Sequence, residues 1–327
     1  MTFEQTSAPP AAAAALPAWL SKDLERVEDL LLATAGASAH PLVSEPSTHL
    51  IKAGGKRLRP ALVLLSAYSG QPGRHSTDLA AAAVELVHIA TLYHDDVMDE
   101  TETRRGVPTA HSKWGIEVAV LAGDFLFACG SSLGAEAAGE VPGLLARAIA
   151  EVCEGQIMET AALDDPARSL DAYFEVITRK TASLFRAACE LGAATSGADE
   201  MDRAPLSRYG LNVGLAFQVV DDLLDIVGDP RTTGKKLGTD LRKGVFTVPI
   251  LLACERDRSL AQRLDAGERD LDVLLPKIVA TGAVADALEM AMSFTRRAHG
   301  ALGEIKTGEY ARSLGGLLDG VLAQILK

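Results

Sequence analysis

The chain is poor in aromatic residues and carries no excess of positive charge. Aromatic residues make up only 5% of its 327 residues, while 48% are hydrophobic and many of these are alanine. This composition favours closely packed helices over a β-rich fold. The 32 Lys and Arg residues are outnumbered by 44 Asp and Glu, giving a net charge of −12, which argues against a nucleic-acid partner. An anionic substrate would therefore have to meet a local cluster of cations or a bound metal ion.

Cysteines are also few, and none form a C-x-x-C pair: Cys129, Cys153, Cys189 and Cys254. Their scatter argues against a structural zinc site and predicts reduced thiols packed within the helices of a cytoplasmic protein. Residues 1–15, rich in Ala and Pro, lack the basic start of a signal peptide and are expected to form a disordered tail. No uncharged run reaches a proline-free membrane-spanning length, so no stable membrane insertion is expected.

Apolar residues recur at helical spacing almost throughout, and no segment shows the alternation of a strand. Residues 16–327 are therefore expected to form one all-α domain, a single large helical bundle around a central cavity. Helices are predicted over 17–34, 44–53, 59–70, 77–103, 109–135, 143–162, 169–196, 203–228, 244–257, 269–301 with a break near Gly282, and 309–326.

Two acidic motifs of identical spacing interrupt otherwise apolar segments, DDVMD at 95–99 and DDLLD at 221–225. Residues i and i+4 of a helix share a face, so the first and last aspartates of each motif project together. Four carboxylates on two apolar helices would repel one another unless a multivalent cation lies between them. Oxygen ligands of this kind suit Mg²⁺, which takes one or two carboxylates and completes its shell with water and substrate phosphates. The predicted metal ligands are Asp95, Asp99, Asp221 and Asp225.

The predicted helix that carries the first motif has its few polar side chains on one face. At 100° per residue they fall within a stripe roughly 100° wide: Glu85, His88, Asp95, Asp99 and Glu102. A polar stripe on a buried helix indicates a water- or ligand-filled space, which makes His88 a candidate contact rather than a core histidine. Gln218, three residues before Asp221, joins the second carboxylate face.

Cationic segments provide candidate sites for phosphate groups. Residues 54–60 read GGKRLRP, Arg104-Arg105 follows the first motif, Lys180-Thr181 lies in an Ala-rich helix, and Lys235-Lys236 lies in a charged, Gly-rich segment. Flexible backbone with Lys and Arg can cradle a diphosphate, and Arg can bind it bidentately. Each segment also has a plainer interpretation, as a solvated loop, a complement to a helix dipole, or a lysine reaching the surface.

In combination these segments resemble the trans-isoprenyl diphosphate synthase (polyprenyl synthetase) family. The resemblance spans residues from about 45 to 255. The matching segments are GGKRLRP at 54–60, ELVHIATLYHDDVMDE at 85–100, RRG at 104–106, GDFLFA at 123–128, EGQ at 154–156, KTASLF at 180–185 and GLAFQVVDDLLDIVGD at 214–229. One departure is visible: where many members have Gly-Lys-x-Thr-x-Pro, residues 244–249 read GVFTVP, so Val245 replaces a lysine.

The resemblance implies a homodimeric, Mg²⁺-dependent prenyltransferase that joins isopentenyl diphosphate to an allylic diphosphate starter. It implies these catalytic residues: Asp95, Asp96, Asp99, Lys180, Asp221 and Asp222. It implies these contacts to the allylic diphosphate: Arg104, Lys180, Thr181, Gln218 and Lys235. It implies these contacts to isopentenyl diphosphate: Lys56, Arg59, His88 and Arg105.

Product length is the least determined property. In the resembled family, bulky aromatic residues at the fourth and fifth positions before the first motif block the growing tail, and here those positions are the small Thr91 and Ala90. The helical wheel places Thr91 about 40° from Asp95, whereas the role of Ala90 rests on the resemblance alone. We therefore expect an all-trans product of roughly C30 to C50. A short-chain farnesyl or geranylgeranyl diphosphate synthase, a class I terpene cyclase and a regulatory subunit of a heteromeric synthase are the alternatives.

Overall fold

The computed structural model describes residues 18–72, 74–228, 237–305 and 308–323, and it is almost entirely helical. The first half of the chain comprises α1 (Ala18–Ala35), α2 (Pro41–Lys52), α3 (Leu58–Ser66), the 3₁₀ turn η2 (Ala67–Ser69), α4 (Arg74–Met98), β1 (Thr103–Arg104), β2 (Val107–Pro108), α5 (Ala110–Trp114), α6 (Ile116–Ala137) and α7 (Val141–Ala161). The predicted all-α class is confirmed.

The second half begins with α8 (Leu170–Ile177), which continues through a π-helical turn, η3 (Thr178–Ala182), into α9 (Ser183–Ser196). It goes on through α10 (Glu200–Val227), α12 (Thr239–Arg242), α13 (Val248–Arg256), α14 (Arg258–Asp265), α15 (Leu271–Ala280), α16 (Ala283–Leu302) and α17 (Glu309–Leu322). Extra residues in a π-helical turn shift side chains around the helix axis, and such turns are frequent at functional sites.

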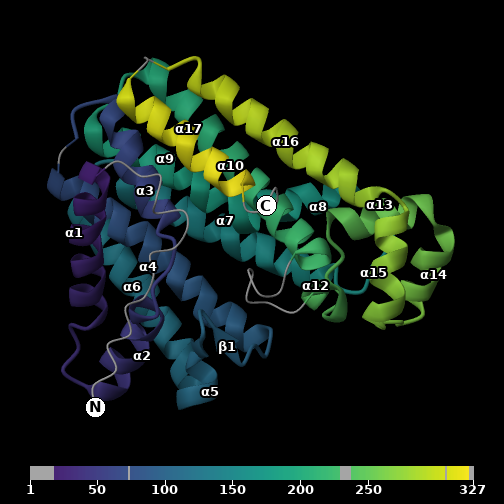
Figure 1. Ribbon diagram of the computed structural model, residues 1–327. Helices are drawn as coiled ribbons and strands as arrows, with labels where there is room; N and C mark the ends of the chain where they lie inside the picture. The colour runs from purple at the N-terminus through teal and green to yellow at the C-terminus, as the bar shows by residue number, and fades with distance from the viewer. Residues whose placement is uncertain (1–17, 73, 229–236, 306–307, 324–327) are drawn as a thin grey trace, which may run out of the picture.

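Two apolar clusters form the core. One surrounds α4, which packs against α3, α6 and α9, and the other surrounds α10, which packs against α13 and α16. Small residues let α4 and α6 approach closely: a Cβ atom at Gly123 would collide with the ring of His94, and one at Gly130 would press on the Ala83 carbonyl. Because α4 is buried on most sides, its polar stripe is a feature of the interior (Figure 1).

The predicted helix 77–103 is too long at its C-terminal end. It stops at Met98, because Glu100 adopts a left-handed backbone (φ 50°), and a two-stranded hairpin follows. The hairpin turn holds Arg105 (φ 53°) and Gly106 (φ 77°), and Arg104 ends β1, so the arginine pair belongs to a hairpin and not to a helix end. The expectation that no strand exists was therefore wrong at this point, and Glu102 does not lie on the helical stripe.

Other boundaries also differ from the prediction. Gly115 (φ 90°) divides the predicted helix 109–135 into α5 and α6, and the predicted helix 244–257 begins only at Val248. The short helices α12 and α14 were not predicted. All four cysteines are free thiols, but Cys153 is exposed on α7, so the packing role expected of it was wrong. The tail at 1–15 and Lys235 lie outside the described residues.

Candidate active site between two aspartate motifs

The first motif ends α4 and places two carboxylates among cations. Asp95 is partly buried, and burial, together with the neighbouring charge of Asp99, raises its pKa to about 6 although Lys180 and Arg104 oppose the shift. Asp99 is more exposed, and its Oδ2 atom lies 3.0 Å from Nζ of Lys243 in the turn after α12. A carboxylate that resists ionisation in this way gains most from a nearby cation.

The middle aspartate of this motif has a different role. Asp96 is buried, with 1% of its surface exposed, and its Oδ1 accepts a 2.6 Å hydrogen bond from Nε of Arg104. Its Oδ2 is buried and has no hydrogen-bond partner in the described part of the chain, and burial raises the pKa of the carboxyl group. Asp96 therefore fastens the hairpin to α4, and this bond holds Arg104 beside the first motif.

The second motif, on α10, shows the same division. Asp222 is buried and accepts hydrogen bonds from the Tyr173 hydroxyl and from Nε2 of Gln218 at 3.0 Å. Burial raises the pKa of Asp222 to about 7, despite these two hydrogen bonds. Asp221, in contrast, is partly exposed. Tyr173, on α8, was missed by sequence reasoning, because a lone tyrosine on an apolar helix carries no distinguishing signal.

Asp225, the last aspartate of the second motif, contacts the segment that follows it. Its Oδ1 accepts from the backbone N–H of Thr239 at 2.9 Å, and its Oδ2 accepts from that of Asp240 at 3.1 Å. These bonds hold the first turn of α12 against α10, since backbone N–H groups at a helix start need external acceptors.

The π-helical turn η3 connects the two motifs. Thr181 Oγ1 donates to Gln218 Oε1 at 2.9 Å, and so joins η3 to the Asp222 network. Lys180 pairs closely with Glu159 of α7. Burial alone would lower the pKa of Lys180, but Glu159 and Asp95 outweigh it and leave the pKa raised. Lys180 is therefore a firmly charged cation beside Asp95 of the first motif.

A basic cluster lies about two helical turns away from the first motif, around His88. Burial lowers the pKa of His88 well below its usual value, and the charges of four arginines reinforce the shift: Arg59, Arg105, Arg104 and Arg57. His88 is therefore neutral at pH 7 and can donate one hydrogen bond while accepting another. Burial also lowers the pKa of Arg59 to about 10. The predicted contacts Arg59, Arg105 and His88 thus lie together.

The basic side chains of GGKRLRP make different contacts. Arg57 has a left-handed backbone (φ 47°) and bridges Glu28 of α1 at 2.7 Å and Glu85 of α4 at 3.1 Å. The predicted cradle therefore includes one arginine whose charge is used to join helices. Arg59 lies 4.5 Å over the Phe185 ring, and its buried Nε has no partner among the described residues. Lys56 is exposed at the edge of the cluster.

Arg104 and Arg105 point to different parts of the site. Arg104 pairs with Asp96, whereas Nη1 of Arg105 donates to the Leu50 carbonyl at 2.8 Å and to the Gly54 carbonyl. The two side chains therefore diverge within a β-hairpin rather than along a helix. The left-handed backbone of Arg105 in the hairpin turn accompanies this separation.

The described side chains of the site cannot hold a metal ion without other ligands. Across the described ranges, no three His, Cys, Asp or Glu side chains converge closely enough to hold a metal ion by themselves. The carboxylates are oxygen donors, and burial raises the pKa of Asp95 among them; they lie beside cations that suit phosphate oxygens. Such a set fits an ion that takes few protein ligands and completes its coordination with substrate phosphates.

Comparison with known proteins identifies the family. Residues 40–273 match the model of the polyprenyl synthetase family. The chain belongs to this family. A nonaprenyl diphosphate synthase of Mycobacterium tuberculosis is 38% identical over 302 residues, which cover 90% of each chain. A short chain isoprenyl diphosphate synthase of Methanothermobacter thermautotrophicus is 38% identical over 254 residues, covering 75% of this chain and 74% of the relative.

The fold agrees with this membership. A crystal structure of a polyprenyl synthase from Caulobacter crescentus, complexed with calcium and isoprenyl diphosphate, superposes with a TM-score of 0.88 at 36% identity and covers 93% of this chain and 95% of that one. This polyprenyl synthetase is therefore a prenyltransferase with the all-α isoprenoid synthase fold. The roles given to individual site residues stay predictions.

Proposed function

We propose that this polyprenyl synthetase condenses isopentenyl diphosphate head-to-tail onto an allylic diphosphate and makes an all-trans-polyprenyl diphosphate of roughly C30 to C50, with Mg²⁺ as cofactor. The observation that carries the proposal is the separation of two anion sites along one helix. His88 and Asp95 both lie on α4, seven positions apart and therefore roughly 10 Å along its axis. One site combines carboxylates with Lys180 and Arg104, and the other is an arginine cluster around a neutral histidine.

The metal would be held by the four aspartates named above: Asp95, Asp99, Asp221 and Asp225. Their oxygen donors and the raised pKa of Asp95 fit a divalent ion that is completed by substrate phosphates. When bound, Mg²⁺ would supply positive charge to the leaving diphosphate as the allylic C–O bond breaks.

The protein's own residues would bind and orient the two substrates. Lys180 and Arg104 hold positive charge beside the starter diphosphate, and the Thr181–Gln218 pair fixes the side of η3 that faces it. Arg59 and Arg105 would bind the second diphosphate, whose attached alkene attacks the allylic carbon. The resulting cation then transfers a proton to the departed diphosphate. Helical walls that exclude water protect the cationic intermediate.

Small side chains above the first motif favour a long product. Ala90 is fully buried and Thr91 partly buried. Both side chains are small, so no aromatic ring occupies these two positions. Sequence identity does not decide the length, because relatives of equal identity are named for long and for short products. Our preference for a long chain therefore rests on these two positions.

A homodimer in the cytoplasm completes the proposal. Neighbouring helices α6 and α7 expose large apolar side chains, Leu121 at 65% and Ile157 at 69%, beside small residues such as Ala128, and exposed apolar groups of this kind mark protein interfaces. By length and composition α6 is apolar enough to cross a membrane. Its packing on α4 through Gly123 and Gly130 accounts for part of that character without one. The four free thiols fit a reducing compartment.

The test is product analysis with the purified full chain. Incubation with labelled isopentenyl diphosphate, a C15 starter and Mg²⁺ should yield C30–C50 products, and chelation with EDTA should stop the reaction. Products that end at C15–C20 would establish the short-chain alternative. Absence of turnover by the chain alone, restored by a second subunit, would establish the regulatory alternative, and cyclised hydrocarbons would establish a terpene cyclase.

A further inference from the structure

A lysine outside the motifs touches the first aspartate motif. Nζ of Lys243 lies 3.0 Å from Oδ2 of Asp99, with 32% and 41% of the two side chains exposed. A partly exposed ion pair of this kind contributes only about 0–1 kcal/mol to stability. The fold therefore gains little from this contact, whereas a partly exposed ammonium group beside a carboxylate that we propose binds metal is well placed to contact a substrate phosphate.

Backbone hydrogen bonds through α12 hold Lys243 in this position. The N–H of Lys243 donates to the carbonyls of Thr239 and Asp240, at 3.2 and 3.0 Å, and the N–H groups of these two residues donate to the Asp225 carboxylate. The last aspartate of the second motif thus holds one end of α12, and Lys243 at the other end reaches the last aspartate of the first motif.

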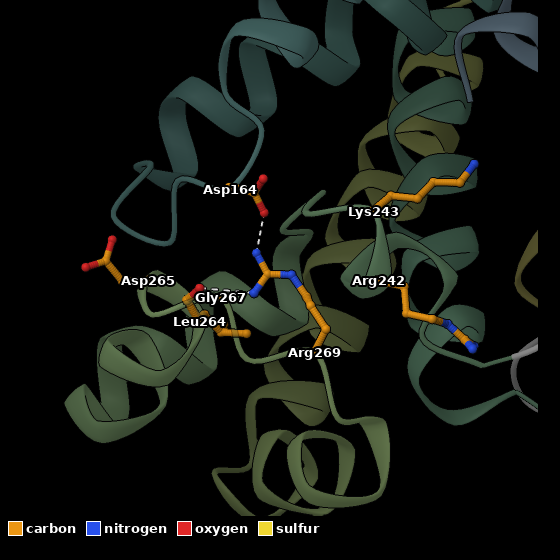
Figure 2. Close-up of a pocket in the computed structure, with 7 residues that line it drawn as sticks. All are labelled: Asp164, Arg242, Lys243, Leu264, Asp265, Gly267 and Arg269. Atoms are coloured by element: carbon orange, nitrogen blue, oxygen red, sulfur yellow. Dashed lines mark hydrogen bonds and ion pairs between the residues drawn. The ribbon is translucent and has the colours of Figure 1, made fainter. Parts of the chain in front are cut away.

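The residue after Lys243 is fixed as well. The carbonyl of Gly244 accepts from the N–H of Asp164 at 2.9 Å, and a Cβ atom at Gly244 (φ 75°) would collide with the Asp164 carboxylate. Asp164 in turn pairs with Arg269. Figure 2 shows this pair on one side of a pocket, while the Lys243 side chain extends away from it and diverges from Arg242. The backbone on either side of Lys243 is thus fixed by hydrogen bonds, whereas its side chain is held by the ion pair with Asp99.

The residue two positions after Lys243 supplies no charge to this turn. Position 245 is valine, partly buried, with its N–H bonded to the Asp240 carbonyl. We propose that Lys243 is a further contact to the starter diphosphate, and that its pairing with Asp99 competes with metal binding at that carboxylate until the diphosphate attracts the ammonium group away. This inference rests on the proposed function, because it assumes a metal and a diphosphate at the first motif.

The competition between Lys243 and a metal ion for Asp99 can be measured as a change in metal affinity. We treat the site as having a dielectric constant near that of water and place the ammonium group roughly 5 Å from the bound divalent ion. Removing the ammonium charge should then raise the affinity for the divalent ion by about tenfold. Lys243→Gln should therefore bind Mn²⁺ about tenfold more tightly than the wild type in the absence of diphosphate, by calorimetry or by the electron paramagnetic resonance signal of free Mn²⁺. In saturating Mn²⁺, the same variant should bind inorganic pyrophosphate about tenfold more weakly, because a direct cationic contact is lost.

Two further variants complete the design. Arg242→Gln, at the adjacent exposed position where the guanidinium bonds to the Leu237 carbonyl, removes the same charge and should change neither affinity. Lys243→Arg should keep pyrophosphate binding. Unchanged Mn²⁺ and pyrophosphate affinities in Lys243→Gln, with normal binding by the wild type, would overturn the role of Lys243 alone. Failure of the wild type to bind either probe would instead contradict the proposed function.

Discussion

Replacement of Asp95 by asparagine should stabilise the metal-free protein while abolishing its activity. The folded chain raises the pKa of this carboxyl group from 3.8 to about 6, chiefly through burial and also through the charge of Asp99. Its ionised form is therefore disfavoured in the fold, and a neutral isostere removes this cost. Functional sites commonly retain such locally unfavourable groups.

The magnitude follows from the shift. A pKa of about 6 against 3.8 corresponds to ~3 kcal/mol in favour of the neutral form, and partial exposure of Asp95 reduces our expectation to ~1.5 kcal/mol. Because the folded pKa is the higher one, the native state is penalised fully above pH 6, and the penalty fades as the pH falls from 6 to 3.8. The stabilisation by Asp95→Asn should thus be full at pH 8 and fall to about a third at pH 4.5.

The assay is thermal and urea unfolding in EDTA, at both pH values. For a domain of this size ~1.5 kcal/mol should raise Tm at pH 8 by about 2 °C. Asp29→Asn, at an exposed position on α1, is the matched control and should leave Tm nearly unchanged. The same Asp95 variant should lose about 10³-fold in kcat with Mg²⁺. A lower Tm at pH 8, or a gain that is larger at pH 4.5, would refute the reasoning.

The other predictions concern the second motif, the arginine pair and the product. Asp221→Ala should lower kcat by about 10³-fold with the fold retained, and near-normal turnover in saturating Mg²⁺ would contradict its role. Arg105→Ala should raise KM for isopentenyl diphosphate far more than for the starter, with the opposite bias in Arg104→Ala; equal effects on both substrates would dismiss the division. Ala90→Phe with Thr91→Phe should shorten the products to C15–C20 by chromatography, and unchanged products would show that the tail takes another path.

Local periodicity was enough to predict what lies on α4. Helical spacing alone placed His88 and Asp95 on one stripe, and the structure puts the first among arginines and the second beside Lys180. Such patterns succeed because a helix fixes the angle between its residues whatever the rest of the chain does. The same reasoning failed at Glu102, because the left-handed backbone of Glu100 ends the helix, and a non-glycine residue in that conformation has no reliable sequence signal.

Partners that lie far apart in sequence could not be predicted. Arg57 and Arg59 lie in one basic motif, yet the guanidinium of Arg57 joins Glu28 and Glu85 on two helices. Tyr173 and Lys243 reach the two aspartate motifs from segments with no motif of their own. Such pairings depend on how helices pack across the bundle, and spacing along a single helix does not contain that information.

The two motifs share a geometry that extends beyond their spacing. In each, the middle aspartate, Asp96 or Asp222, is buried and accepts from a residue of a neighbouring segment. The last aspartate of each contacts one end of the α12 turn: Asp225 holds its first N–H groups and Asp99 meets Lys243. A step of one residue turns a side chain by 100°, so the middle position points away from the face shared by the outer two. The DDxxD spacing therefore directs the middle carboxylate to a neighbouring segment and the last one to α12, which links the ends of the two motifs.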